Sequence, residues 1–226
     1  MSEFNFKTAQ EHELNWQLSY IESNLPYRYK IWKKRRDNRE PDSLLTSWFP
    51  PEDQWNLRDE FLKHIKGKNV LDIGCGSIPQ IREMWGNEKI VIDPLANEYI
   101  LHQDKLFGGS FFDDMTVHAQ PAEILINDLE YEIDWAIVCR NILDHSEDPL
   151  KILENISKYA TSECYLLFWS DLWHDGDTDD GHKNITRSIS SILATITGLG
   201  FRYVNPIPSQ HNESTGVEFG GVFRMV

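Results

Sequence analysis

The chain has 226 residues, of which 40 % are hydrophobic, enough for one α/β domain with a sizeable core and an appended cap. Its formal net charge of −14 gives a surface that repels polyanions, so nucleic acid is an unlikely partner. No stretch approaches the roughly 20 apolar residues that span a bilayer. The N-terminus lacks a signal pattern, and Cys75, Cys139 and Cys164 form no Cys-x-x-Cys pair. We therefore expect a cytoplasmic protein with reduced thiols and no membrane partner.

Residues 1–68 are predicted to form a separate N-terminal helical cap. Leu14, Leu18, Ile21 and Leu25 recur at spacings of one helix face, and Pro26 should end that helix. A second helix is expected from Pro51 to Lys66, with Gly67 as its C-cap and an aromatic-proline corner before it.

A basic run lies between the two predicted helices. It holds seven of the chain's 22 positive charges: Arg28, Lys30, Lys33, Lys34, Arg35, Arg36 and Arg39. The run is interpreted either as a solvated helix face or as a positive wall for an anionic substrate. The aromatic residues of this cap would suit a core, or a lid that covers an acceptor site. If the cap is a lid, deleting residues 1 to about 50 should abolish catalysis and leave a folded, cofactor-binding core.

Residues 69–226 are predicted to form the core domain, because strands and helices alternate along them. The expected strands are Asn69–Ile73, Lys89–Asp93, Met115–Ala119, Trp135–Cys139, Cys164–Trp169, Phe201–Val204 and Val217–Val226. The expected helices carry Ile78, Ile81 and Trp85; Tyr99, Ile100 and Leu106; Leu150, Leu153 and Ile156; and Ile185 to Ile196. This alternation is typical of an α/β, doubly wound, mostly parallel sheet with its ligand at the carboxyl ends of the strands. The last two strands have no helix between them, so the seventh could insert antiparallel.

The segment Val70-Leu71-Asp72-Ile73-Gly74-Cys75-Gly76 predicts a nucleotide site. A buried strand ends in a glycine turn, where the backbone can approach a ligand closely. Asp93, 19 residues after Gly74, ends the next strand, where a carboxylate can accept hydrogen bonds from ribose hydroxyls. The third glycine of the dinucleotide fingerprint is absent, and Asp72 opposes a phosphate and suits a cationic ligand. The pattern therefore favours a nucleoside without phosphates.

These residues resemble the class I S-adenosylmethionine-dependent methyltransferases. The glycine segment resembles that family's first motif, Pro121 to Leu125 resembles the segment bordering adenine, and Asp134 to His145 resembles its fourth motif. The resemblance implies a Rossmann-like, seven-stranded sheet of order 3-2-1-4-5-7-6 and an enzyme that methylates a small-molecule acceptor. Ser77 replaces a frequent third glycine, and Pro121 stands where family members often carry an acid.

The resemblance also implies a set of cofactor-binding residues. Gly74 and Gly76 would pack against the methionine part of S-adenosylmethionine, Asp72 would hold its ammonium directly or through water, Asp93 its ribose, and Ala122 would border adenine. The candidate set is completed by Cys75, Pro94, Glu123, Arg140 and Asn141.

Methyl transfer depends on holding acceptor and methyl carbon in line, with a base only if the acceptor must lose a proton. His145, at the carboxyl edge, and His182, in the loop after the fifth strand, are the candidate proton acceptors. The acidic loop Ser170–Asn184 matches no known metal-ligand spacing, so no metal is expected.

Two other functions stay open. One is a non-catalytic, methyltransferase-like subunit that binds a partner. The other is a nicotinamide-dependent reductase, although Tyr29-x-x-x-Lys33 precedes the glycine turn, whereas in short-chain reductases such a pair follows it. The acceptor, its methylated atom and the oligomeric state are not determined by the sequence.

Overall fold

The computed structural model describes residues 6–38, 67–84, 87–173, 182–186, 188–206 and 216–226. A seven-stranded sheet has the order β3-β2-β1-β4-β5-β7-β6. The strands are β1 (Asn69–Ile73), β2 (Glu88–Ile92), β3 (Thr116–His118), β4 (Ala136–Arg140), β5 (Tyr165–Trp173), β6 (Phe201–Pro206) and β7 (Val217–Met225). β7 pairs antiparallel with both β5 and β6, and the other pairs are parallel. The predicted fold class and strand order are confirmed.

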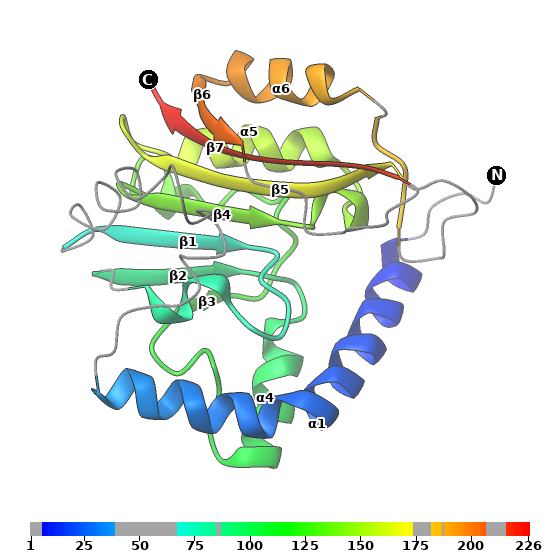
Figure 1. Ribbon diagram of the computed structural model, residues 1–226, viewed down its shortest axis with the longest axis vertical. Coiled ribbons are helices and arrows are strands. Elements are labelled where there is room, and N and C mark those ends of the chain that lie inside the picture. Colours follow the sequence, from blue (N-terminus) through cyan, green and yellow to red (C-terminus); the bar gives the residue numbers. More distant parts are fainter. Residues whose placement is uncertain (1–5, 39–66, 85–86, 174–181, 187, 207–215) are drawn as a thin grey trace.

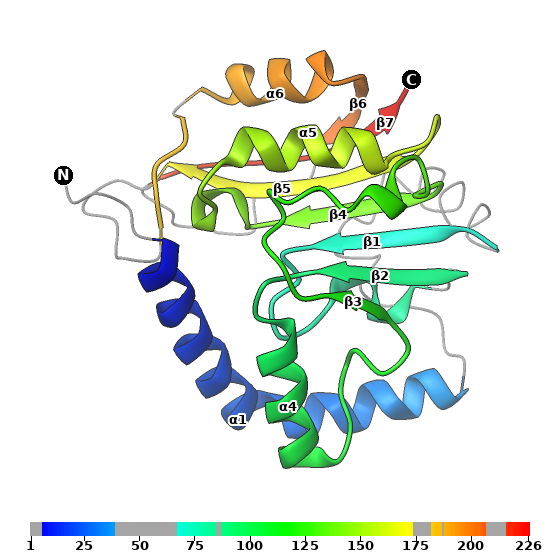
Figure 2. The same ribbon diagram turned by 180° about the vertical axis from the view of Figure 1, so that it is seen from behind.

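Alternate residues of the central strands face two separate cores. On one face Val70, Val91 and Val138 pack with residues of α1 (Phe6–Asn38) and α4 (Ala96–Phe107). On the other face Leu71 and Ile137 pack with residues of α5 (Pro149–Tyr159) and α6 (Ile189–Gly198). Figures 1 and 2 show α1 and α4 on the β3 side of the molecule, and α5 and α6 on the β7 side.

Helix α1 differs from the sequence prediction, because it continues through Pro26 to Asn38. Proline has no amide hydrogen for the bond to the carbonyl four residues earlier, and such positions bend a helix where packing holds it together. Figure 1 shows α1 bent into two legs. Buried Ile21 and Leu25 precede the proline and buried Tyr29 and Trp32 follow it, so core packing on both sides sustains the helix.

These four buried side chains also correct the deletion expectation. Ile21, Leu25, Tyr29 and Trp32 belong to the same hydrophobic core as the sheet residues Val70 and Val138. Deleting residues 1 to about 50 would therefore remove part of the core, and a folded remainder is not expected. The predicted helix from Pro51 to Lys66 and its aromatic-proline corner lie outside the described residues.

Three other elements differ from prediction. The turn after β1 leads into a single 3-10 turn, η1 (Gln80–Glu83), where an α-helix was expected. Strand β5 runs on to Trp173, since it pairs with β7 as far as that residue, so Ser170 to Trp173 belong to a strand and not to the expected loop. Helix α6 begins only after Ser188, whose side chain accepts a hydrogen bond from the amide of Ser191, and Ile185 precedes it.

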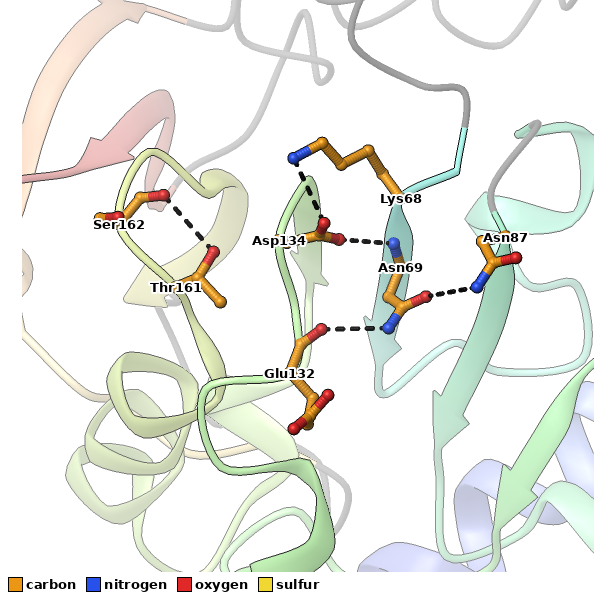
Figure 3. A network of polar contacts seen from close by, with 7 residues as sticks. All are labelled: Lys68, Asn69, Asn87, Glu132, Asp134, Thr161 and Ser162. Carbon is orange, nitrogen blue, oxygen red and sulfur yellow. Dashed lines mark hydrogen bonds and ion pairs between the residues drawn. The ribbon is translucent and has the colours of Figure 1, made fainter.

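The amino ends of the strands are joined by polar contacts (Figure 3). Asp134 accepts a hydrogen bond from the amide of Asn69 at 2.7 Å and pairs with Lys68 at 3.2 Å. The Asn69 side chain donates to the carbonyl of Glu132 and accepts from Asn87. This network fixes the start of β1 and leaves the opposite edge of the sheet to the ligand cavity. None of the helices in the described ranges has the length and apolar character needed to cross a membrane.

Candidate functional site

A cavity of about 810 Å³ lies at the carboxyl ends of β1, β2 and β4. Its volume is in the range of small-molecule sites. Figure 1 shows the arrowheads of these strands pointing toward the first leg of α1, drawn in deep blue. Of the candidate residues from the sequence, the cavity is lined by Gly74, Cys75, Gly76, Asp93, Pro94, Ala122, Glu123, Arg140, Asn141, His145 and His182.

The glycine turn forms a tight cradle in the cavity wall. Gly74 and Gly76 have φ of 66° and 60°, in the left-handed region that favours glycine. A Cβ built on Gly74 would lie 2.4 Å from Cδ1 and 2.8 Å from Cβ of Ile142. Any side chain at Gly74 would therefore force Ile142, another lining residue, out of position.

Asp93 is held at the cavity by the same turn. One carboxylate oxygen accepts a hydrogen bond from the amide of Gly76 at 2.9 Å, and the other accepts from the amide of Leu95 at 2.8 Å. Burial raises the pKa of Asp93 to about 6, although these two amides lower it. The carboxylate is thus pre-positioned beside the glycines, with an acceptor oxygen available to a ligand's hydroxyl groups.

Asp72 lies beneath the turn instead of on the cavity lining. Its side chain is buried and accepts hydrogen bonds from the amides of Gln80 and Ile81, which begin η1. The expectation that Asp72 holds a ligand's ammonium, directly or through water, stays a prediction. The buried carboxylate organises the backbone below the cavity.

The pKa of Asp72 is raised to about 7, first by burial and further by Asp93, while the two amides and Arg82 lower it. In the unfolded chain the group titrates near 3.9. Between those values the folded protein binds the extra proton, so the free energy of unfolding should fall as pH rises from about 4 to about 7 and then level off.

We expect Asp72→Asn to remove this part of the pH dependence, because an amide mimics the protonated acid. The difference in unfolding free energy between wild type and variant should change by a few kcal/mol, at about 1.4 kcal/mol per pKa unit, between about pH 4 and 7. Urea unfolding at several pH values measures it. Asp134→Asn, at the far edge of the sheet, controls for the loss of one carboxylate. A difference that does not vary with pH would contradict the assignment.

The first leg of α1 supplies residues that the sequence did not reveal. His12, Glu13, Trp16, Gln17 and Tyr20 line the cavity. Gln17 Oε1 accepts hydrogen bonds from the hydroxyl of Ser77 at 2.5 Å and from its amide at 3.4 Å, and Gln17 Nε2 donates to Glu13 at 2.7 Å. The helix is thereby joined to the glycine turn. The apolar spacing of α1 identified its buried face, but no pattern in the sequence showed that the opposite face meets a cavity.

Arg140 and Asn141 lie where β4 ends. Arg140 Nη1 is 3.4 Å from Gln80 Oε1, and its guanidinium lies over the ring of Trp169 at 5.8 Å. Burial lowers the pKa of Arg140, and Asp72 raises it. The backbone amide of Asn141 donates a hydrogen bond to Trp169 O at 2.7 Å. The φ of Asn141 is 50°, so the chain turns sharply where β4 ends. With Arg28 and Arg82, Arg140 gives the cavity three arginines.

The three cysteines are buried and differ in their surroundings. Cys75 lines the cavity, whereas Cys139 lies in β4 and Cys164 directly before β5. Burial raises the pKa of all three thiols above the ordinary value. Neutral thiols at these positions are unreactive at neutral pH.

Known structures have a fold similar to that of this chain. The N-methyltransferase NodS from Bradyrhizobium japonicum, solved with S-adenosylhomocysteine, has a TM-score of 0.54 at 16 % identity, over 81 % of this chain and 99 % of that chain. An S-adenosylmethionine-dependent methyltransferase from Mesorhizobium loti has a TM-score of 0.55 at 12 % identity, over 76 % and 97 % of the two chains. This chain has the class I methyltransferase fold. The resemblance inferred from the glycine turn and Asp93 is thus confirmed at the level of the fold.

A curated protein is also similar to this chain in sequence. The tRNA U34 carboxymethyltransferase of Colwellia psychrerythraea is 27 % identical over 156 residues, which are 68 % of this chain. The chain spans 47 %, about half, of the length of this curated relative. A scan against models of known protein families gives no match.

Proposed function

We propose that the protein transfers a methyl group from S-adenosylmethionine to a small-molecule acceptor. The observation that carries the proposal is the pairing of the Gly74–Gly76 cradle with Asp93, hydrogen-bonded to Gly76 at the edge of a methyltransferase-fold sheet. A ligand would lie against the bare backbone of this turn. Ile142 leaves no room for a side chain on Gly74. The carboxylate of Asp93 suits ribose hydroxyls.

The charges around the cavity fit a cationic cofactor. Asp93 and Glu13 line it, and Asp72 lies beneath it. A sulfonium with an ammonium group would be attracted by these carboxylates, whereas a pyrophosphate placed at the glycine turn would be repelled by Asp93. This favours S-adenosylmethionine over a nicotinamide dinucleotide as the ligand. When bound, the cofactor supplies the electrophilic methyl group, and the residues around it hold the acceptor in line.

The acceptor is expected to enter beside α1 and the β4 edge. Arg28, Arg82 and Arg140 line this cavity, which favours an acceptor carrying a carboxylate or phosphate group. His145 and His182 lie at the same cavity and are the candidate proton acceptors for a neutral nucleophile. The first leg of α1 would cover the bound molecules, as the lid hypothesis states.

A tRNA acceptor is a second candidate. The Colwellia relative is named for a tRNA substrate, and α1 exposes Arg28, Lys30, Lys33 and Lys34 along its second leg. The net charge of −14 opposes binding of a polyanion unless this basic stretch dominates locally. We therefore favour a small anionic acceptor over tRNA.

Thermal unfolding with S-adenosylmethionine, S-adenosylhomocysteine, NADH and NADPH in parallel tests the cofactor. A ligand at 100 times its dissociation constant adds about 2.7 kcal/mol, which raises the midpoint by roughly 5–10 °C for a chain of this size. A rise with the two sulfur nucleosides alone supports the proposal, and a rise with a nicotinamide alone overturns it.

Transfer of a labelled methyl group to small-molecule extracts or to total tRNA then separates the acceptors. Label in the tRNA fraction that disappears when Lys30, Lys33 and Lys34 are changed to Gln would favour the second candidate. Cofactor binding without transfer to either pool would favour a non-catalytic subunit.

A further inference from the structure

Three metal-ligating side chains meet at the end of the cavity. Asp144 and His145 belong to η3 (Leu143–His145), which follows β4, and His182 lies beyond β5 in the sequence. One donor atom from each lies within 4.8 Å of the other two. The imidazole rings of His145 and His182 have centroids 4.3 Å apart and are tilted by 55°.

Hydrogen bonds between backbone atoms hold the segments that carry these residues together. The amide of Lys183 donates to the carbonyl of Asp144 at 2.8 Å, which joins the His182 segment to η3. The amides of Ile185 and Thr186 donate to Leu172 O at 2.9 and 3.0 Å, which anchors the same segment to β5. The positions of the three residues are therefore fixed by backbone contacts at the ends of β4 and β5.

The separation of the one carboxylate–histidine pair with a known distance is compatible with a shared ion. His145 Nε2 and Asp144 Oδ2 are 3.7 Å apart, beyond the range of a hydrogen bond between those atoms. Two ligand atoms that each lie about 2.0–2.2 Å from one metal ion are separated by roughly 3–3.5 Å. Small side-chain rotations would bring the three donor atoms to that spacing.

The electrostatic surroundings are negative. Glu123 accepts hydrogen bonds from the amides of Glu147 and Asp148, so three further acidic residues lie beside the cluster. Lys183 directs its ammonium to Glu147 O at 2.8 Å. A divalent cation would be stabilised by this field.

We propose that Asp144, His145 and His182 bind one divalent transition-metal ion. Two imidazole nitrogens and one carboxylate oxygen suit Zn²⁺, Mn²⁺, Fe²⁺, Co²⁺ or Ni²⁺ more than Mg²⁺ or Ca²⁺, which prefer oxygen ligands throughout. Asp144 is fully buried, whereas both histidines line the cavity, so the remaining coordination positions would face the acceptor space. In this arrangement the histidines are ligands and an acceptor oxygen would complete the coordination. The ion's binding does not depend on the proposed cofactor.

The test uses the full chain without an affinity tag, stripped with EDTA and titrated calorimetrically with Zn²⁺ and with Mn²⁺. We expect one ion per chain with either or both metals. His182→Ala and His145→Ala should each weaken binding by roughly 100-fold or more, since each removes a direct ligand. The matched control is His102→Ala: His102, in α4, also faces a carboxylate, Glu22, at 3.2 Å, and its loss should leave metal binding unchanged.

The outcomes separate this proposal from the base role of the histidines and from failure of the cofactor proposal. Wild-type protein that binds neither metal, or a His145→Ala/His182→Ala double variant that binds as tightly as wild type, overturns the site. Circular dichroism and the S-adenosylhomocysteine thermal shift, repeated on each variant, show whether it remains folded. If a single variant unfolds, the test uses the unfolding midpoint with and without zinc. A zinc-induced rise in the wild type that is lost in Asp144→Asn supports the site, and a rise of equal size in both overturns it.

Discussion

Gly74→Ala is expected to weaken cofactor binding by roughly 100-fold and, with it, methyl transfer. The added Cβ would lie 2.4 Å from Ile142 Cδ1 and 2.8 Å from Ile142 Cβ, so the rotation of one terminal methyl does not relieve the overlap. The turn and the Ile142 segment must move apart, which displaces the cradle from Asp93. A rearrangement that costs about 3 kcal/mol lowers affinity by roughly 100-fold. Calorimetric titration with S-adenosylhomocysteine measures the loss.

Gly108→Ala is the matched control for this variant. Gly108 ends α4 with φ of 67°, almost the value of Gly74, but a Cβ there meets nothing within 4 Å. The two variants share the left-handed strain of about 1–2 kcal/mol, and only Gly74→Ala adds the overlap. Cofactor affinity in Gly108→Ala should equal that of wild type. Equal affinity in both variants would show that the cradle is not the ligand's site.

Trp32→Ala is expected to destabilise the protein by about 3–5 kcal/mol, the usual cost of removing a buried large aromatic side chain. Trp32 is 2 % exposed, with its ring 5.2 Å from that of Phe111 and 5.5 Å from that of Tyr29. For a chain of this length the unfolding midpoint should fall by about 6–20 °C. Thermal unfolding monitored by circular dichroism measures it.

Trp16→Ala provides the comparison on the same helix. Trp16 is 57 % exposed, stacks on Tyr20 and lines the cavity. Its removal should cost less than about 1 kcal/mol of stability and should instead alter ligand binding. If both variants lose the same stability, the division of α1 into a cavity-lining leg and a core-packing leg is wrong.

Much of the sheet was predictable, because its strands are short apolar runs bounded by turn residues. The apolar run Asn69–Ile73 is such a local signal, and it forms β1 in the structure. The 3-10 turn after Pro79 was missed, because apolar spacing at Ile78 and Ile81 resembles a helix while the buried Asp72 carboxylate fixes a tighter turn. That carboxylate's partners come from tertiary structure, which spacing alone does not reveal.

The cavity was only half predictable. Motif residues from Gly74 to Asn141 could be placed at one sheet edge, since parallel strands bring their carboxyl ends together. The contribution of α1 could not, because Gln17 meets Ser77 across 60 residues of sequence. Pro26 also misled the prediction, since its local cost is outweighed by the packing of Ile21, Leu25, Tyr29 and Trp32. The approach of His182 to His145 likewise depends on contacts with Leu172 and Asp144.

The placement of the three cysteines gives the chain its own reporters of motion. An alkylating reagent can reach Cys75 when the cavity wall opens, whereas Cys139 and Cys164 become accessible only when the sheet comes apart. Labelling at Cys75 would therefore follow local opening, and labelling at the other two would follow global unfolding. A ligand seated on the glycine turn would block labelling of Cys75 directly, and it would slow labelling of the other two by stabilising the folded chain. Mass spectrometry of time-quenched samples would then give the rate at which the cavity opens, with no engineered cysteine.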